Sequence, residues 1–108
     1  MNESEMKMKL KLGVLDLVPK LPETTAEAAL EQAIRLARQA EERGYLRYWT
    51  AEHHDMEALA SAAPEVLLSA IGAATRRIRL GSGAVLLPHY SPLKVAENFR
   101  LLAALYPG

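Results

Sequence analysis

The chain has 108 residues, enough for one domain that buries roughly two-thirds of the surface of its unfolded form. Thirteen basic residues balance thirteen acidic ones, so we expect neither nucleic acid nor a membrane surface as a partner. The absence of cysteine excludes disulfides and thiolate chemistry. No apolar run approaches the roughly 20 residues of a membrane span, and the N-terminus lacks the apolar core of a secretory signal, so a cytoplasmic location is expected.

The N-terminal part predicts a tail and then a strand. Residues 1–8 are polar and are expected to form a flexible tail, and residues 9–108 form the domain. Leu10–Leu17 alternates apolar residues with lysine and glycine, which is typical of a strand. Pro19 and Pro22 then end that strand.

The first helix and the second strand follow. Thr24 precedes Glu27 by three residues, a capping-box pattern that predicts the start of a helix. Apolar residues recur at helical spacing until Gly44, which ends the helix as the glycine after its last turn. Tyr45–Ala51 contains three aromatic residues and is predicted to be the second strand, with Trp49 in the core.

The second half repeats this alternation. Pro64 fits the first turn of a helix, and Ser91-Pro92 is a capping serine followed by a proline at the first helical position. Ile78–Leu87 is apolar nearly throughout, as in a parallel strand covered on both faces. Its glycines, Gly81 and Gly83, indicate a bulge or a close approach to the backbone.

The resulting order is β-α-β-α-β-α, an α/β fold. Three βα units in about 100 residues give a number of residues per unit like that of a (β/α)8 barrel, whose full length is about 250 residues. A doubly wound sheet would need a glycine-rich phosphate-binding turn after strand one, and the residues around Asp16 contain none. Gly81-Ser82-Gly83 does not extend to a dinucleotide fingerprint, because Leu86 takes the third glycine position.

Polar residues cluster where the strands end. Glu52, His53 and His54 follow the second strand, and the carboxyl ends of parallel strands face the ligand in barrels and open sheets. Imidazoles exchange protons near neutral pH, so these histidines are candidate catalytic residues. Asp16 ends the first strand at the same rim, where it lines the pocket or forms an Asx turn before Pro19.

Four blocks of sequence carry a family resemblance. They read RYWTAEHH (Arg47–His54), ASAAPEVL (Ala60–Leu67), RIRLGSGAVLLP (Arg77–Pro88) and HYSPLKVAE (His89–Glu97). Their order and spacing resemble the bacterial luciferase-like flavin-dependent monooxygenases, from Leu10 to Gly108. The resemblance implies the N-terminal three βα units of a TIM barrel, without the later segment that grips the flavin phosphate.

The resemblance also implies a cofactor and residue roles. Reduced FMN is the expected cofactor, with the deazaflavin F420 as the alternative. His53 would take part in proton transfer near the flavin, with His54 as a supporting group. The Gly83–Ala84 peptide would be a non-proline cis bond in a bulge against which the flavin ring packs, and the contact would extend to Val85.

Several alternatives stay open at this stage. Glu52 either orients an imidazole or caps the following loop, and a metal site from Glu52, His53, His54 and Asp55 would need convergent geometry. The chain is interpreted as the N-terminal part of a monooxygenase acting with O2 on a small organic substrate. Alternatively it is a catalytically incomplete fragment that self-associates, with a homodimer as the expected form.

Overall fold

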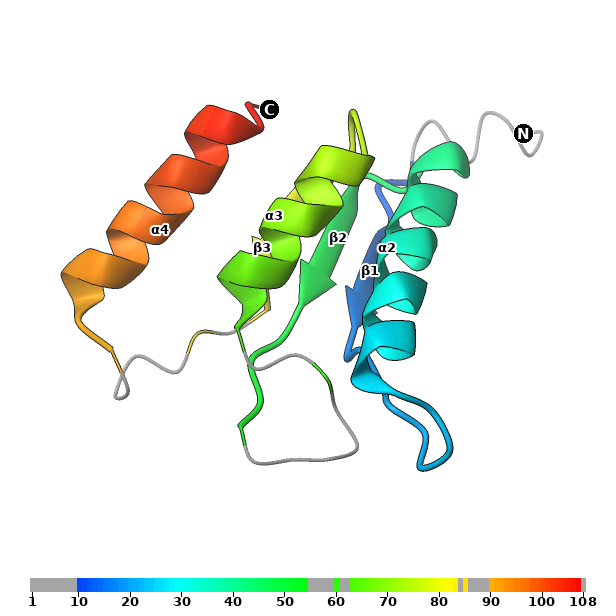
Figure 1. Cartoon of the computed structure of the whole chain (residues 1–108). Coiled ribbons are helices and arrows are strands. Elements are labelled where there is room, and N and C mark those ends of the chain that lie inside the picture. The colour runs from blue at the N-terminus through cyan, green and yellow to red at the C-terminus, as the bar shows by residue number, and fades with distance from the viewer. Residues whose placement is uncertain (1–9, 55–59, 61–62, 84, 86–89, 108) are drawn as a thin grey trace.

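The computed structural model describes residues 10–54, 60, 63–83, 85 and 90–107. Strands and helices alternate along the chain, as predicted (Figure 1). Their bounds are β1 Gly13–Asp16, α2 Ala26–Glu42, β2 Arg47–Thr50, α3 Pro64–Ala74, β3 Arg79–Ser82 and α4 Pro92–Leu105.

The three strands form one parallel sheet in the order β1-β2-β3, which confirms the predicted topology. The register aligns Leu15, Trp49 and Gly81 across the sheet. Each strand pairs over four residues and is shorter than predicted. The described part of β3 ends at Ser82 because Gly83 bends away after donating its N–H to the carbonyl of Thr50. The rest of the predicted third strand lies largely outside the described residues.

Helix α2 begins one residue later than its sequence pattern predicts. Thr25 is the N-cap, and its hydroxyl accepts a hydrogen bond from the N–H of Ala28 at 3.1 Å. Thr24 instead donates its hydroxyl to the carbonyl of Leu21 at 2.9 Å, so it closes the preceding turn and is not available to cap. The predicted end is confirmed, since Gly44 follows the helix with φ of +84°.

The proline starts of the other two helices are confirmed. Pro64 and Pro92 occupy the first turns of α3 and α4. Ser91 is the N-cap of α4 by position, but among the described residues its side chain makes no capping hydrogen bond. Helix α4 also has no buried residue and lies beside α3, away from the centre of the sheet (Figure 1).

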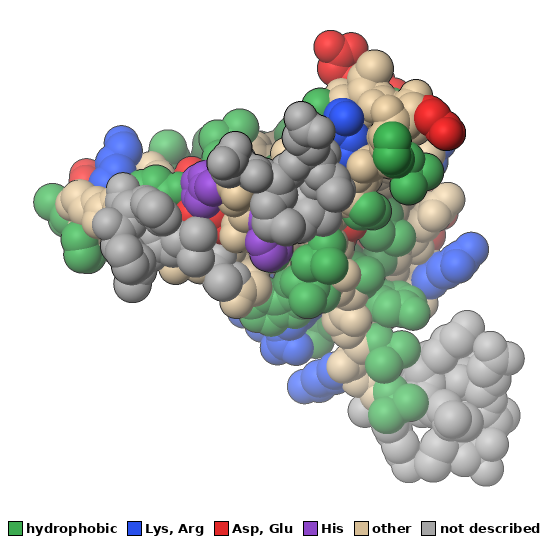
Figure 2. Space-filling view, turned by 90° about the horizontal axis from the view of Figure 1, so that it is seen from below, with side chains coloured by type: hydrophobic (Ala, Val, Ile, Leu, Met, Phe, Trp, Pro, Cys, Tyr) green, Lys and Arg blue, Asp and Glu red, His purple; other side chains and the backbone are tan. Residues whose placement is uncertain are grey.

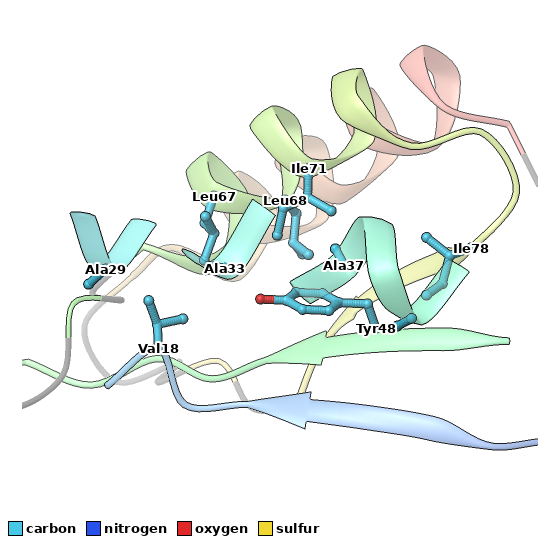
Figure 3. Packing of buried hydrophobic residues seen from close by; sticks show 10 residues of the cluster. Val18, Ala29, Ala33, Ala37, Tyr48, Leu67, Leu68, Ile71 and Ile78 are labelled. Carbon is cyan, nitrogen blue, oxygen red and sulfur yellow. The ribbon is translucent and has the colours of Figure 1, made fainter. Parts of the chain in front are cut away.

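The core lies between the sheet and helices α2 and α3, which cover one face of it (Figure 3). Helix α2 presents alanines to the sheet, and this lets the helix approach closely around the Tyr48 ring, which is fully buried. The buried hydrophobic residues are Val18, Ala29, Ala33, Ala37, Ala40, Tyr48, Leu67, Leu68, Ile71 and Ile78.

The opposite face of the sheet, called here the open face, carries Leu15, Trp49 and Gly81. Leu15 is 59% exposed and Trp49 is 38% exposed. The expectations that Trp49 is core and that the third strand is covered on both faces are therefore wrong for the described residues. The indole spans both neighbouring strands: a Cβ on Gly81 would lie 2.7 Å from its ring, and a Cβ on Gly13 would lie 3.3 Å from its Nε1.

Candidate functional site

The candidate site lies where the strands end. Because all strands are parallel, the residues after Asp16, Thr50 and Ser82 emerge at the same edge of the sheet. Viewed toward this edge, histidine side chains reach the molecular surface (Figure 2). The predicted site residues that the structure describes therefore lie at this edge.

Glu52 is the centre of a three-residue cluster. Its Oε2 lies 2.6 Å from Nε2 of His54 and accepts a hydrogen bond from the hydroxyl of Tyr90 at 2.8 Å. The Tyr90 oxygen and His54 Nε2 are 3.3 Å apart, so the three groups form a compact triangle. The Glu52 side chain is fully buried, whereas that of His54 is 39% exposed. A buried carboxylate thus orients an imidazole that remains accessible at the rim.

Tyr90 was not singled out from the sequence. The hydrogen bond to Glu52 raises the pKa of its phenol above the ordinary value, and burial and the negative charges of Glu52 and Glu65 act in the same direction. The available signal was its position, because Tyr90 comes shortly after the predicted third strand, Ile78–Leu87. The phenol of a tyrosine at this position can donate a hydrogen bond to a neighbouring side chain.

His53 is partly buried at the same rim, next to the cluster in sequence. The Glu52 carboxylate bonds to His54, so of the two arrangements considered for Glu52, orientation of an imidazole is the observed one, with the second histidine as the oriented ring. Asp55, a member of the alternative metal site, lies outside the described residues. Among those described, no three His, Asp or Glu side chains converge as a metal site would require.

Asp16 lies on the helix-covered face and is 7% exposed. Its Oδ2 accepts from the hydroxyl of Tyr48 at 2.6 Å, and its Oδ1 accepts from the N–H of Val18 at 2.9 Å. The second bond is that of an Asx turn, the alternative that the sequence left open. Burial raises the pKa of Tyr48 well above its ordinary value, and the Asp16 carboxylate adds to the effect.

Of the three residues expected to contact the flavin, the structure describes Gly83 and Val85. Gly83 is exposed, and Val85 is partly buried beside Tyr90. A Cβ on Gly83 would lie 3.3 Å from Leu15 Cδ1 and 3.4 Å from the Thr50 carbonyl, so the exposed Leu15 side chain would have to shift slightly to admit one. The expected bulge and cis peptide involve Ala84, which lies outside the described residues.

Comparison with known proteins places this fold and rim in a family. Residues 8–108 match the profile described as luciferase-like monooxygenase. The chain belongs to the luciferase-like monooxygenase family. N-acetyl-S-alkylcysteine monooxygenase of Bacillus subtilis is 50% identical over 99 residues, which are 92% of this chain and 30% of that protein.

Solved structures of luciferase-like proteins agree with this fold. The crystal structure of apo-MsnO8 has a TM-score of 0.87 at 52% identity and covers 90% of this chain and 30% of its own. The oxygenating constituent of 3,6-diketocamphane monooxygenase from Pseudomonas putida, solved with FMN, has a TM-score of 0.81 at 26% identity over 87% and 26% of the two chains. The chain thus spans about 30% of the length of the curated relatives it matches, and it folds as the corresponding part of a TIM barrel. Within the described part, none of the helices has the length and apolar character of a membrane span.

Proposed function

We propose that this chain is the N-terminal part of a flavin-dependent monooxygenase that uses reduced FMN and O2 on a small organic substrate. The observation that carries the proposal is the buried Glu52 carboxylate paired with an accessible His54 at the ligand rim of a luciferase-like sheet. The relative solved with FMN favours FMN over F420. The cytoplasmic location and the absence of nucleic-acid and membrane partners stay predictions from the sequence.

The flavin contact belongs at Gly83, Ala84 and Val85. Gly83 fits a planar ring because its backbone is exposed and carries no side chain. A bound reduced flavin would supply the chemistry with O2. The protein would orient the flavin and the substrate and would transfer protons. Asp16 is assigned to the support of the first strand end, since its carboxylate is engaged by Tyr48 and Val18.

The proton-transfer group is assigned to the histidine pair. His53 is proposed as the catalytic histidine and His54 as the supporting one, with Glu52 holding the His54 ring. In the alternative, His54 is the catalytic histidine and His53 the supporting one. The contact between Glu52 and His54 favours this alternative. A carboxylate that accepts from one ring nitrogen fixes the protonation of the other nitrogen, which is the usual arrangement of an imidazole base.

Alanine variants in a complete enzyme that contains this segment test the assignment. General acid–base assistance contributes about 10²–10⁴-fold, so we expect His53→Ala to lower kcat by about this factor with little change in flavin affinity. His54→Ala should have the smaller effect. Equal loss in both would show shared roles, and a larger loss in His54→Ala would make His54 the proton-transfer residue. Unchanged kcat in both variants would refute the assignment.

A second candidate is that the 108-residue chain has no turnover of its own and self-associates. It is favoured by the exposed apolar side chains of Leu15 and Trp49 and by the two unpaired edges of the described sheet, on β1 and β3. Parallel sheets occur almost only with both faces covered, and zero net charge removes the repulsion between copies. We therefore expect a homodimer or higher oligomer in sedimentation at micromolar concentration. A monomer that melts cooperatively would contradict this.

A further inference from the structure

We propose that Tyr90 is a positioning residue that holds the Glu52 carboxylate and the His54 ring in one fixed arrangement. This inference rests on the proposed function, because the orientation of the His54 ring matters for catalysis only if the rim transfers protons. It adds to the histidine pair a side chain from a distant part of the chain.

Two groups meet one acceptor atom. The Tyr90 hydroxyl donates to Glu52 Oε2 at 2.8 Å, and His54 Nε2 lies 2.6 Å from the same oxygen. With Glu52 ionised, the carboxylate carries no proton, and His54 Nε2–H is the second donor. The Nε2 proton of His54 is therefore engaged with Glu52.

Burial explains why the tyrosine matters to this pair. A fully buried carboxylate is costly unless donors compensate for the lost water, and Tyr90 provides one donor besides His54. The bond also joins two loops that are 38 residues apart, because Glu52 follows β2 whereas Tyr90 lies two residues before α4. Tyr90 thus fixes the carboxylate relative to α4 and thereby the ring that the carboxylate holds.

The surroundings of Tyr90 favour a role through Glu52 over a ligand site of its own. The cavity beside the ring has a volume of about 20 Å³ and is lined in part by Val85, Glu65 and Lys94. About 10–15 Å³ suffices for one water, so this space is too small for an organic substrate. Among the described residues, Glu52, Glu65 and Lys94 bring charge near the phenol, together with His54 when it is protonated.

Nuclear magnetic resonance on the 108-residue chain without flavin tests the proposal. In the wild type we expect a directly observed His54 Nε2–H signal, protected from exchange by Glu52. Tyr90→Phe removes the hydroxyl alone and should make this proton exchange at least about tenfold faster. Tyr106→Phe is the matched control, because it removes a hydroxyl that donates to the Ser69 carbonyl at 2.8 Å, at the other end of α4. Equal exchange in wild type and Tyr90→Phe would overturn the proposal.

A second measurement does not depend on the fold of the tyrosine variant. The Tyr90 phenol is titrated in the wild type and in Glu52→Gln, and loss of the carboxylate should bring its raised pKa down toward the ordinary value. A Tyr90 titration that Glu52→Gln leaves unchanged would also overturn the proposal. Neither measurement uses flavin or turnover, so failure here would leave the monooxygenase proposal standing, and an inactive complete enzyme would leave the Tyr90 result standing.

Discussion

The two faces of the sheet differ in a way that reverses the usual pattern. On the covered face, under α2 and α3, the polar residues Asp16 and Thr50 are buried beside Tyr48. On the open face, the apolar residues Leu15 and Trp49 are exposed. Both sets come from the same strands, because successive side chains point to opposite sides. In a TIM barrel the side away from the helices is the packed interior, so the open face is the one that a longer relative would bury.

The covered face is complete in itself. The Thr50 hydroxyl donates to the Asp16 carbonyl at 3.2 Å, and the Tyr48 hydroxyl donates to the Asp16 carboxylate. Each of these buried side chains therefore has a hydrogen-bond partner, as buried polar groups require. The difference between the faces indicates that the stability of this chain comes from the helix side, while the open face contributes little until something covers it.

The largest expected difference between the faces comes from removing a leucine side chain. Leu68 is 1% exposed under the helices, and Leu68→Ala should cost about 2–5 kcal/mol in the free energy of unfolding. Leu15→Ala, the same change at a residue 59% exposed, should stay within about 0.5 kcal/mol. Urea unfolding at low protein concentration measures both. A large cost for Leu15→Ala that grows with concentration would instead show that copies of the chain cover the open face.

Glycine-to-alanine changes give a smaller contrast. A Cβ on Gly72 would lie 2.5 Å from the ring of Tyr106, whose hydroxyl is held by the Ser69 carbonyl, so the ring has little freedom to move. Overpacking costs about 1–3 kcal/mol and the gain in helix propensity returns about 1, so Gly72→Ala should be destabilising by about 1 kcal/mol. At Gly81 the conflict is with the outer ring of Trp49, which is exposed and can move. Thermal melts should therefore show a lower Tm for Gly72→Ala than for Gly81→Ala, and the opposite order would contradict the comparison.

The sequence predicted the elements well because their signals are local. Strand alternation, the prolines at Pro64 and Pro92 and the glycine at Gly44 each act within a few residues, and the structure confirms the topology and helix ends that they indicate. The cap at Thr24 was wrong because two neighbouring threonines compete. Which of them caps depends on the turn before the helix, and the capping-box pattern does not describe that turn.

The site was less accessible to sequence reasoning. Periodicity places Glu52, His53 and His54 at a strand end, but which histidine meets the carboxylate depends on how the loop leaves β2. The contact with Tyr90 joins segments 38 residues apart, so no local pattern contains it. Trp49 was predicted to be buried for a related reason: its aromatic character suits a core, but burial depends on residues that would have to cover the open face.

Glu41 fixes the covering helices to the sheet. It lies near the C-terminal end of α2, and its Oε2 accepts hydrogen bonds from three successive backbone N–H groups, those of Arg76, Arg77 and Ile78, at 2.8, 2.5 and 2.8 Å. These residues lead into β3. Burial raises the pKa of Glu41, but the three backbone donors and the charge of Arg77 outweigh this and lower the pKa below the ordinary value.

The smallest expected effect is the pH dependence that follows from this contact. Because the pKa of Glu41 is lower in the folded chain than in the unfolded one, its contribution is complete above the unfolded value of about 4.5 and is lost as pH falls through the folded value. Glu41→Gln should therefore lower the stability at pH 7 and flatten its decline on acidification. Glu42→Gln, the adjacent exposed carboxylate, is the matched control and should leave the profile nearly unchanged. Urea unfolding of all three chains between pH 7 and pH 3 measures the effect. Parallel profiles for Glu41→Gln and the wild type would mean that the negative charge of Glu41 does not contribute to the stability of the folded chain.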